Sequence, residues 1–454
     1  MLETSLQMSV AACVFLLVVQ VSIYAIRRFI VSPPLESGFL EVARLDNAGK
    51  GAVALITGGC SGIGLETAIQ LYRAVDMDII LGCRDETTAE AICKHLTTYT
   101  GSDIQDKSNS DSSTSSSSSS SSSNRRKCFA PGPLDLSSFE SVRSFASSVS
   151  HIPGKVPSIL ILNAGIRHNN FNLTGDGIES HYQINYLSHF LLVNLLLPIM
   201  NKSPAEEIRV VHVSSTAHYF GKIDRKLYGV VSQMNKKEIS PFIAGRLKLS
   251  ETRYDDAGDV IFEGNQVTID YNEIQKHGRE VFYQIQNNRL EGVYGDTKLM
   301  QVLFSDELQK RFDSNLNQRY NRPIAEKEER KADLLMKKKK FKSISVHPGF
   351  VNSNMGHEDS RWMQTMLVLA RPFLARNLFE GSLSTLYAAV SPHLHGGEYI
   401  DNCVVTPVLS RGKIESRDTI SSLPPGSEPD IARFLWDTSA KLCGLTITLE
   451  YNEE

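Results

Sequence analysis

A short apolar run that leads directly into closely spaced glycines limits the fold of this chain more than any other stretch. Residues 52–57, Ala-Val-Ala-Leu-Ile-Thr, are long enough for one buried strand, and Gly58-Gly59-Cys60-Ser61-Gly62-Ile63-Gly64 follow them. A helical pattern then starts at Leu65. Glycines let the backbone approach a pyrophosphate, which sits at the positive N-terminus of the helix. The run therefore predicts a dinucleotide-binding unit of a doubly wound α/β fold.

A second apolar run, residues 77–83, reads as the next buried strand and ends where the adenosine ribose should lie in such a fold. Cys83 at its end is not acidic, and Arg84 follows. A carboxylate there would hold a free 2'-hydroxyl, whereas an arginine can pair with a 2'-phosphate, so we expect NADP(H) rather than NAD(H). The alternative is that Arg84 merely begins a surface helix.

Tyr294 and Lys298 stand four positions apart in Tyr-Gly-Asp-Thr-Lys, on a stretch that reads as a helix. Residues i and i+4 lie on one helix face, so the phenol and the ammonium can point into the same cleft. A lysine close to a phenol favours its ionised form, and we expect it to lower the pKa of the tyrosine toward the range of an acid/base catalyst. The alternative for this common spacing is an exposed helix face.

Charge and cysteine content exclude several function classes. The net charge of −3 and the pI near 6.5 argue against a nucleic-acid-binding protein. The seven cysteines form no C-x-x-C pair and no cluster with histidine, so we expect no metal site and no disulfides, only reduced thiols facing a cytosol.

Residues 8–26 form an uncharged apolar run that is long enough to cross a bilayer. Glu3 precedes the run, and Arg27 and Arg28 follow it. By the positive-inside bias, this order places the remainder of the chain in the cytosol. The alternative is a cleaved signal peptide, but the basic residues flank the far end of the run, so we expect an uncleaved single-pass anchor.

The motifs occur in one order along the chain: the glycine loop, Asn163-Ala164-Gly165, Asn185, Ser215, Tyr294, Lys298 and His347-Pro348-Gly349. Two further apolar runs, 158–162 and 208–213, precede Asn163 and Ser214-Ser215 as strands. With its leading threonine, the loop resembles the T-G-x-x-x-G-x-G loop of short-chain dehydrogenases/reductases, and the series covers about residues 50–445. The resemblance implies a Rossmann-type, mainly parallel sheet and a nicotinamide cofactor.

The resemblance also implies roles for individual residues. Ser215 would orient the substrate, Asn185 would hold a helix irregularity and a water of a proton relay, and Asp135 would lie against the adenine. The implied catalytic set is Asn185, Ser215, Tyr294 and Lys298, and the implied cofactor contacts are Gly58, Ser61, Gly62, Ile63, Gly64, Arg84, Asp135, Asn163, Ala164, Gly165, Tyr294, Lys298 and Val351.

Several shorter stretches resemble the retinol-dehydrogenase-like and WW-domain-oxidoreductase-like branch of the family. They include Val213-Ser214-Ser215-Thr216-Ala217-His218 and Leu435-Trp436. Members of this branch are often membrane-anchored and act on lipophilic substrates. The apolar segment 362–378 lies where relatives cap the substrate cleft, so it would suit an aliphatic or polyprenoid substrate, although a plain core helix would look the same.

Three segments depart from the family pattern. Residues 99–127 contain a serine run and predict a disordered insertion. Residues 225–290 lengthen the connection before Tyr294 and would form either a lid over the cleft or a loop at its rim. Residues 317–340 are dense in charge and would be a solvated arm or a contact to anionic lipid heads.

These observations together predict an NADP(H)-dependent oxidoreductase that interconverts a carbonyl and an alcohol on a sterol, retinoid or fatty or sphingoid lipid. It would be anchored in a membrane, with the endoplasmic reticulum expected and the catalytic domain in the cytosol. The alternative is a non-catalytic scaffold or cofactor-sensing protein that kept the fold. The intact Ser215, Tyr294 and Lys298 argue against that alternative, since a scaffold has no use for their chemistry.

Overall fold

The computed structural model places the predicted doubly wound sheet at the centre of the chain. It describes residues 39–47, 51–99, 126–223, 225–228, 253–254, 260–262, 265–266, 271–288, 291–321, 339–351, 375–406, 409–410, 413–414 and 431–445. The expected anchor at 8–26 lies outside the described residues, as do most of 99–127 and of 317–340 and residues 362–374 of the apolar segment.

The main sheet has eight strands in the order β11-β10-β9-β5-β4-β1-β2-β3. Every neighbouring pair in it is parallel except β10 and β11, which are antiparallel. Its strands are β1 Val53–Thr57, β2 Asp78–Gly82, β3 Cys128–Phe129, β4 Ile159–Leu162, β5 Glu207–Val213, β9 Lys340–His347, β10 Tyr399–Asp401 and β11 Val404–Val405. The strand order reverses direction beside β1, so the chain has the Rossmann-type arrangement that the sequence predicts.

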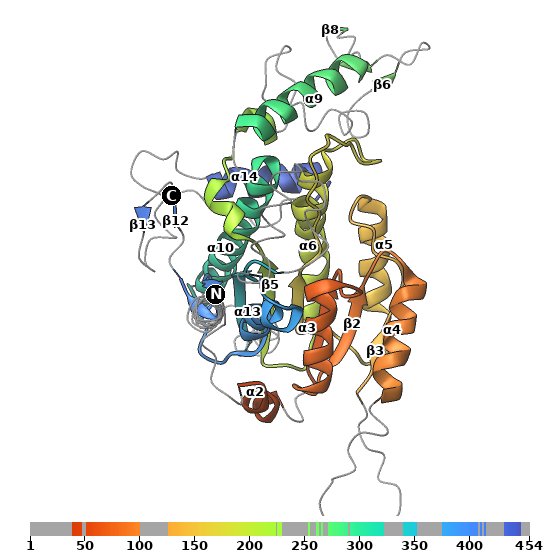
Figure 1. Ribbon diagram of the computed structural model, residues 1–454, viewed down its shortest axis with the longest axis vertical. Coiled ribbons are helices and arrows are strands. Elements are labelled where there is room, and N and C mark those ends of the chain that lie inside the picture. Colours follow the sequence, from red (N-terminus) through yellow and green to blue (C-terminus); the bar gives the residue numbers. More distant parts are fainter. Residues whose placement is uncertain are drawn as a thin grey trace, which may run out of the picture.

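Helices cover both faces of this sheet (Figure 1). One face carries α3 Gly62–Arg73, α4 Glu86–Tyr99 and α13 Leu378–Val390. The other carries α5 Phe139–Ser150, the π-helix η2 Tyr182–Leu187 with α6 Ser188–Met200, α10 Gly292–Asn321 and α14 Ile431–Leu442. Further elements are α2 Phe39–Asn47, the 3-10 helix η3 Thr216–Phe220, α7 Arg225–Tyr228, α9 Tyr271–Asn288, and the short strands β6 Arg253–Tyr254, β7 Val260–Phe262, β8 Asn265–Gln266, β12 Leu409–Ser410 and β13 Lys413–Ile414.

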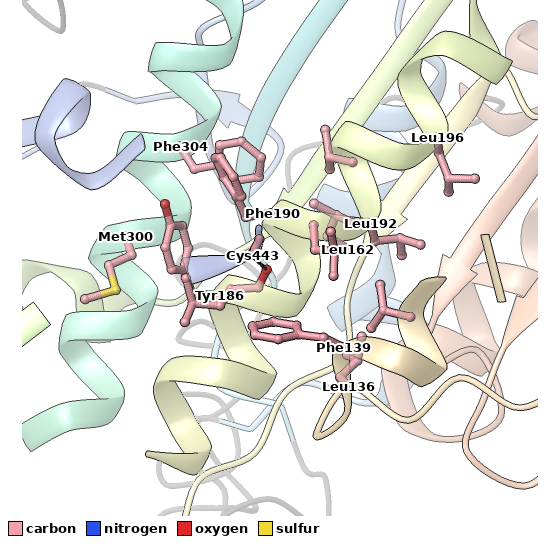
Figure 2. Packing of buried hydrophobic residues seen from close by; sticks show 14 of the residues in the cluster. Leu136, Phe139, Leu162, Tyr186, Phe190, Leu192, Leu196, Met300, Phe304 and Cys443 are labelled. Atoms are coloured by element: carbon pink, nitrogen blue, oxygen red, sulfur yellow. Dashed lines mark hydrogen bonds between the residues drawn. The ribbon is translucent and has the colours of Figure 1, made fainter. Parts of the chain in front are cut away.

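Aromatic side chains fill the core between α6 and α10. Figure 2 shows Phe190 of α6 and Phe304 of α10 pointing toward one another, and their ring centroids are 5.0 Å apart. Trp436 of α14 lies 5.0 Å from Phe190 in an edge-to-face arrangement. Such pairs add about 0.5–1.5 kcal/mol each beyond the burial of their surface. This packing fixes α10, the helix that carries Tyr294 and Lys298, against the sheet.

The structure confirms the predicted strands to within about one residue at each end. Residues 52–57 and 77–83 correspond to β1 and β2, and 158–162 and 208–213 correspond to β4 and β5. The short strands β3, β10 and β11 were not predicted, because two or three residues carry no readable periodicity.

Four of the seven cysteines form disulfides, so the expectation of reduced thiols is wrong for them. Cys60 of the glycine loop is bonded to Cys83 after β2, with 6.1 Å between their Cα atoms. Cys93 of α4 is bonded to Cys128 of β3, with 4.9 Å between their Cα atoms. Each pair joins residues that only the fold brings together, which is why their spacing in the sequence gave no sign of pairing.

Among the described residues, one helical stretch, Tyr182–Met200, has the length and apolar character of a membrane span. It is the helix formed by η2 and α6, and most of it is buried in the core described above. We therefore read this stretch as a core helix.

Candidate active site

The predicted site residues gather where β1, β4 and β5 end at one edge of the sheet. Because these strands are parallel, their carboxyl ends meet there. Thr57 ends β1, Asn163 follows β4 and Ser214 follows β5. Open α/β sheets bind their ligands at this edge, so the sequence and the topology indicate the same place.

The glycine loop forms a cradle at the start of α3. Gly58 adopts a φ of +65°, which favours glycine. A Cβ at Gly64 would collide with the carbonyl oxygen of Gly58 and with Nδ2 of Asn163. Ser61 precedes the helix, and its side chain makes no capping hydrogen bond with the residues that the structure describes. The N-terminus of α3 is thus built for an anionic group, and the loop, including Ile63, fits the pyrophosphate of a dinucleotide.

Thr57 connects the loop to the segment after β4. Its Oγ1 accepts hydrogen bonds from the backbone N–H groups of Asn163 and Ala164, each at 3.0 Å. Nδ2 of Asn163 donates back to the carbonyl oxygen of Thr57, also at 3.0 Å. Nε2 of His189 lies 3.0 Å from the same hydroxyl. Asn163 and Ala164 therefore hold the end of β1 in place beside the loop.

The expected adenosine residues lie near the end of β2. The backbone N–H of Leu134 donates to the carbonyl oxygen of Cys83 at 2.7 Å, which brings Asp135 to this strand. The carboxylate of Asp135 accepts from the backbone and the hydroxyl of Ser137. Arg84 is exposed. Its side chain is thus placed in solvent at the strand end, where a 2'-phosphate would approach.

Asn185 lies in the π-helical turn η2, a helix irregularity of the kind that the resemblance implied. Its Oδ1 accepts from the backbone N–H of Ile166 at 2.7 Å. Its Nδ2 donates to the carbonyl oxygen of Ile166 at 3.0 Å and to Oγ1 of Thr297 at 3.1 Å. The amide therefore joins the segment after Gly165 to the helix that carries the tyrosine.

Lys298 is buried, and its ammonium is directed at polar groups of the sheet edge. Its Nζ donates to the carbonyl oxygen of Val213 at 2.9 Å and to Oε1 of Gln301 at 3.2 Å. Nε2 of Gln301 in turn donates to the carbonyl oxygen of Asn185 at 2.8 Å. Burial lowers the pKa of Lys298 to about 7, because charging the amine in the interior is unfavourable.

Tyr294 is buried one turn earlier on α10, and its hydroxyl is hydrogen-bonded to the side chain of Ser215. Burial raises the pKa of Tyr294 to about 12, whereas Arg167 and Ser215 act in the opposite direction. The expected lowering of this pKa by Lys298 is therefore not what the structure gives. The reason is geometric: Nζ of Lys298 is 5.5 Å from the ring centroid and bonds to other groups.

Three residues of the site lie outside every sequence motif: Arg167, Glu291 and Gln301. Arg167 is four residues beyond Asn163, and Glu291 is three before Tyr294. A charged residue directly beside a catalytic motif would have been the only signal for the first two. Gln301 shares a helix face with Lys298, and i,i+3 spacing could have found it.

Helix α9, from the expected insertion 225–290, packs beside the site. Phe282 of α9 is fully buried, and its ring lies 5.7 Å from that of Phe171 and 6.0 Å from that of His181. Figure 1 shows α9 at the top of the view, beyond the end of the molecule where α10 begins. Helix α9 therefore contacts the core through Phe282.

On the far side of the site, Val351 pairs with Arg376 in an isolated bridge after β9. Nη1 of Arg376 donates to the carbonyl oxygen of Pro348 at 3.0 Å, which fixes the turn through Gly349. No group of three or more His, Cys, Asp or Glu side chains suited to a metal ion occurs in the portion of the chain that the structure describes.

Comparison with known proteins supports the family that the motifs indicate. The family model described as short chain dehydrogenase matches residues 108–230. Human retinol dehydrogenase 11 is 26% identical over 404 residues, which cover 87% of this chain and 87% of that protein. The human WW domain-containing oxidoreductase is 26% identical over 398 residues, 86% of this chain and 68% of that protein.

A third relative matches more strongly over a shorter stretch. Mouse polyprenol dehydrogenase is 36% identical over 176 residues, which cover 38% of this chain and 45% of that protein. The similarity to retinol dehydrogenase and to the WW domain-containing oxidoreductase agrees with the branch that the shorter motifs suggest.

Proposed function

We propose that this protein, a short-chain dehydrogenase/reductase by its motifs and its relatives, interconverts a carbonyl and an alcohol on a lipophilic substrate with NADP(H). One observation supports the proposal most directly. The hydroxyl groups of Tyr294 and Ser215 are hydrogen-bonded to each other, at the same edge of the sheet as the glycine loop. An acid/base group and a hydrogen-bond donor beside a nucleotide cradle are the parts that carbonyl reduction needs.

Tyr294 and Ser215 have different roles in the proposed reaction. In the reductive direction Tyr294 donates its proton to the carbonyl oxygen of the substrate, and Ser215 holds that oxygen by a hydrogen bond. Because burial keeps Tyr294 protonated over the physiological pH range, it is ready to act as the acid. In the oxidative direction the same phenol must first lose its proton, so the reaction then depends on whatever stabilises the phenolate.

Hydrogen bonds connect Lys298 to the π-helical turn that holds Asn185. Its Nζ bonds to Gln301, and Gln301 bonds to the backbone of Asn185 in the π-helical turn. With a pKa of about 7, Lys298 can both accept and release a proton near neutral pH. We infer that it exchanges protons between Tyr294 and water near Asn185.

The cofactor would be held by groups on both sides of the sheet edge. NADP(H), when bound, supplies or accepts the hydride. Gly58, Ser61, Gly62, Ile63 and Gly64 would hold its pyrophosphate at the N-terminus of α3. Arg84 would pair with the 2'-phosphate, Asp135 would contact the adenine, and the remaining expected contacts are Asn163, Ala164, Gly165, Tyr294, Lys298 and Val351.

A lipophilic substrate is supported by the named relatives, since one is a retinol dehydrogenase and one a polyprenol dehydrogenase. Sterols, retinoids and fatty or sphingoid lipids all meet this description.

A non-catalytic scaffold remains the alternative. The buried Lys298 disfavours it, because an amine with a pKa of about 7 beside a phenol suits proton transfer, and a scaffold has no use for that chemistry. The test is to mix purified protein and NADPH with a panel of lipid ketones and aldehydes and to follow the absorbance of the cofactor. Consumption by the wild type and none by Tyr294→Phe would support the enzyme, and no consumption with any compound would favour the scaffold.

Membrane attachment is a separate part of the proposal. Residues 8–26 would cross the membrane of the endoplasmic reticulum once, with the catalytic domain in the cytosol, because Arg27 and Arg28 follow the apolar run. The two disulfides argue for the lumenal side instead, since disulfides persist in oxidising compartments.

Two sequons decide between these orientations. Asn172-Leu173-Thr174 has an exposed asparagine, and Asn201-Lys202-Ser203 is the second site. For a cytosolic domain we expect neither asparagine to carry a glycan in cells, measured as an unchanged gel mobility after treatment with a glycosidase. A mobility shift that Asn172→Gln abolishes would place the domain in the lumen.

A further inference from the structure

The side chain of Arg167 lies against the ring of Tyr294, although no motif includes it. Its guanidinium carbon is 5.7 Å from the centroid of the ring. Its Nε is 3.3 Å from Oε2 of Glu291, in the turn that precedes α10. The two side chains of this ion pair are 30% and 24% exposed, so they lie at the border between the buried phenol and solvent.

Arg167 differs from Lys298 in the permanence of its charge. With a pKa of about 7, Lys298 is uncharged in a large fraction of molecules near neutral pH, and its ammonium bonds to Val213 and Gln301. A guanidinium stays charged at every pH at which the protein is folded. Arg167 therefore supplies a permanent positive charge beside the phenol.

We propose that Arg167, held in place by Glu291, is a positioning residue that stabilises the phenolate of Tyr294 whenever that side chain has given up its proton. The inference rests on the proposed function, because the phenolate forms only if Tyr294 transfers protons. The sequence motifs supply one positive group beside Tyr294, the side chain of Lys298. Arg167 would be a second, and the carboxylate of Glu291 would hold it in place.

Charged groups reach Tyr294 from three parts of the fold: Arg167 from the segment after β4, Glu291 from the turn before α10, and Lys298 from α10 itself. Ser215, after β5, adds a hydroxyl. Arg167 lowers the pKa of Tyr294 and Glu291 raises it, so the pair acts on the phenol with opposite signs.

Other titratable side chains near this end of the sheet include Asp296, which is hydrogen-bonded to other groups, and His218 and His347, which stay neutral. The carboxylate of Asp296 accepts from the backbone of Lys222 and from the hydroxyl of Tyr228, each at 2.7 Å. Burial lowers the pKa of His218 to about 4 and that of His347 to about 3, so neither changes charge above pH 6 or so. A pH profile measured above that range therefore reports on Tyr294, Lys298 and their neighbours.

The main experiment is the pH profile of kcat for alcohol oxidation at saturating cofactor and alcohol, where the rate rises as Tyr294 loses its proton. For Arg167→Gln we expect the rising limb to move up by about one pH unit. Because the pKa of Tyr294 is about 12, the pH range in which the protein can be assayed lies below this limb, and the rate should fall about tenfold throughout that range. Arg167→Lys, which keeps the charge, should recover most of the loss.

Glu291→Gln is the matched control of opposite sign. The amide oxygen can still accept from Arg167, but the negative charge is gone, so the limb should move down. The affinity for NADPH, measured by its fluorescence, should change less than about twofold in all three variants. An unchanged rate in Arg167→Gln, a loss that Arg167→Lys does not recover, or a loss in Glu291→Gln would overturn the proposal.

A second measurement does not need turnover. The ultraviolet absorbance of the phenolate is titrated in each variant against the same variant carrying Tyr294→Phe, so that the difference belongs to Tyr294 alone. We expect a lower midpoint in Glu291→Gln than in the double variant Arg167→Gln, Glu291→Gln, which differ only in the guanidinium. Equal midpoints would refute the role of Arg167, whereas a wild-type protein that oxidises no alcohol would refute only the proposed function.

Discussion

The two sides of the proposed site are held together by different forces. On the cofactor side, Thr57, the glycine loop, Asn163 and Ala164 are joined by hydrogen bonds between neutral groups. On the proton-transfer side, Tyr294 lies among Arg167, Glu291 and Lys298, whose charges are partly or fully buried. The cofactor side is therefore determined by shape and should be insensitive to pH, whereas the proton-transfer side should respond to it.

The largest expected effect comes from removing one oxygen atom, the hydroxyl of Tyr294, which should change the proton-transfer side and leave the cofactor side intact. Tyr294→Phe removes the proton-transferring group, so turnover should fall by about 100-fold or more, while the affinity for NADPH stays almost unchanged. Rates with a lipid aldehyde and NADPH fluorescence measure the two quantities. Tyr283→Phe on the exposed face of α9 is the control and should keep full activity. Undiminished turnover in Tyr294→Phe would remove the central residue of the proposed mechanism.

The cofactor side carries a covalent link that the other side lacks in the described residues. Replacing both Cys60 and Cys83 by serine opens a loop with a sequence separation of 23 residues. The free energy of unfolding in denaturant should fall by about 3 kcal/mol under oxidising conditions, because the unfolded chain gains freedom. The difference should vanish when both proteins are measured with a reducing agent. A difference that persists there would mean that packing and not the bond is responsible.

The pH response of stability should come from the proton-transfer side. The pKa of Lys298 is about 7 in the folded protein and about 10.4 when unfolded, so between these values the unfolded chain holds the additional proton and stability rises with pH. Lys298→Met loses this rise, and its free energy of unfolding relative to wild type should fall by roughly 3 kcal/mol from pH 7 to pH 10.

Lys441→Met on α14, where the lysine is exposed, is the control for this measurement and should stay parallel to wild type. An unchanged difference across the window in Lys298→Met would show that the amine is charged throughout. Turnover and cofactor binding should both suffer in Lys298→Met, whichever way the stability changes.

The smallest effect concerns the outer end of the cofactor side. Arg84→Ala should weaken binding of NADPH by about tenfold and leave that of NADH unchanged, because only the former has a 2'-phosphate to pair with the guanidinium. Lys94→Ala, an exposed residue on α4, is the matched control for loss of one positive charge. Equal losses for both cofactors, or a wild-type preference for NADH, would contradict the assignment of NADP(H).

The sequence predicted features that depend on neighbouring residues better than features that depend on packing between distant segments. The strands β1, β2, β4 and β5 were predicted nearly to the residue, because each is a run of apolar residues next to a motif. Asn185 was expected at a helix irregularity and lies in a π-helical turn. These features depend on residues that are close together in the chain, so local patterns suffice to find them.

Features that join distant segments were missed. The contact of Arg167 with Tyr294, the two disulfides and the burial of Phe282 each depend on how separate elements pack. The pKa of Tyr294 was expected to be lowered, because i,i+4 spacing says that two side chains share a face but not where the ammonium points. Here Lys298 bonds to the end of β5, and burial of the phenol dominates.

Both ends of the long connection before Tyr294 are fastened to α10. At its start, the hydroxyl of Tyr228 donates to Asp296 at 2.7 Å, and at its end the backbone N–H of Val293 donates to Gln286 at 3.3 Å. For a connection pinned in this way, doubling its length costs only about 0.6 kcal/mol of closure entropy. Residues inserted between Tyr228 and the start of α9, such as a tag or reporter domain, should therefore leave the catalytic helix in place.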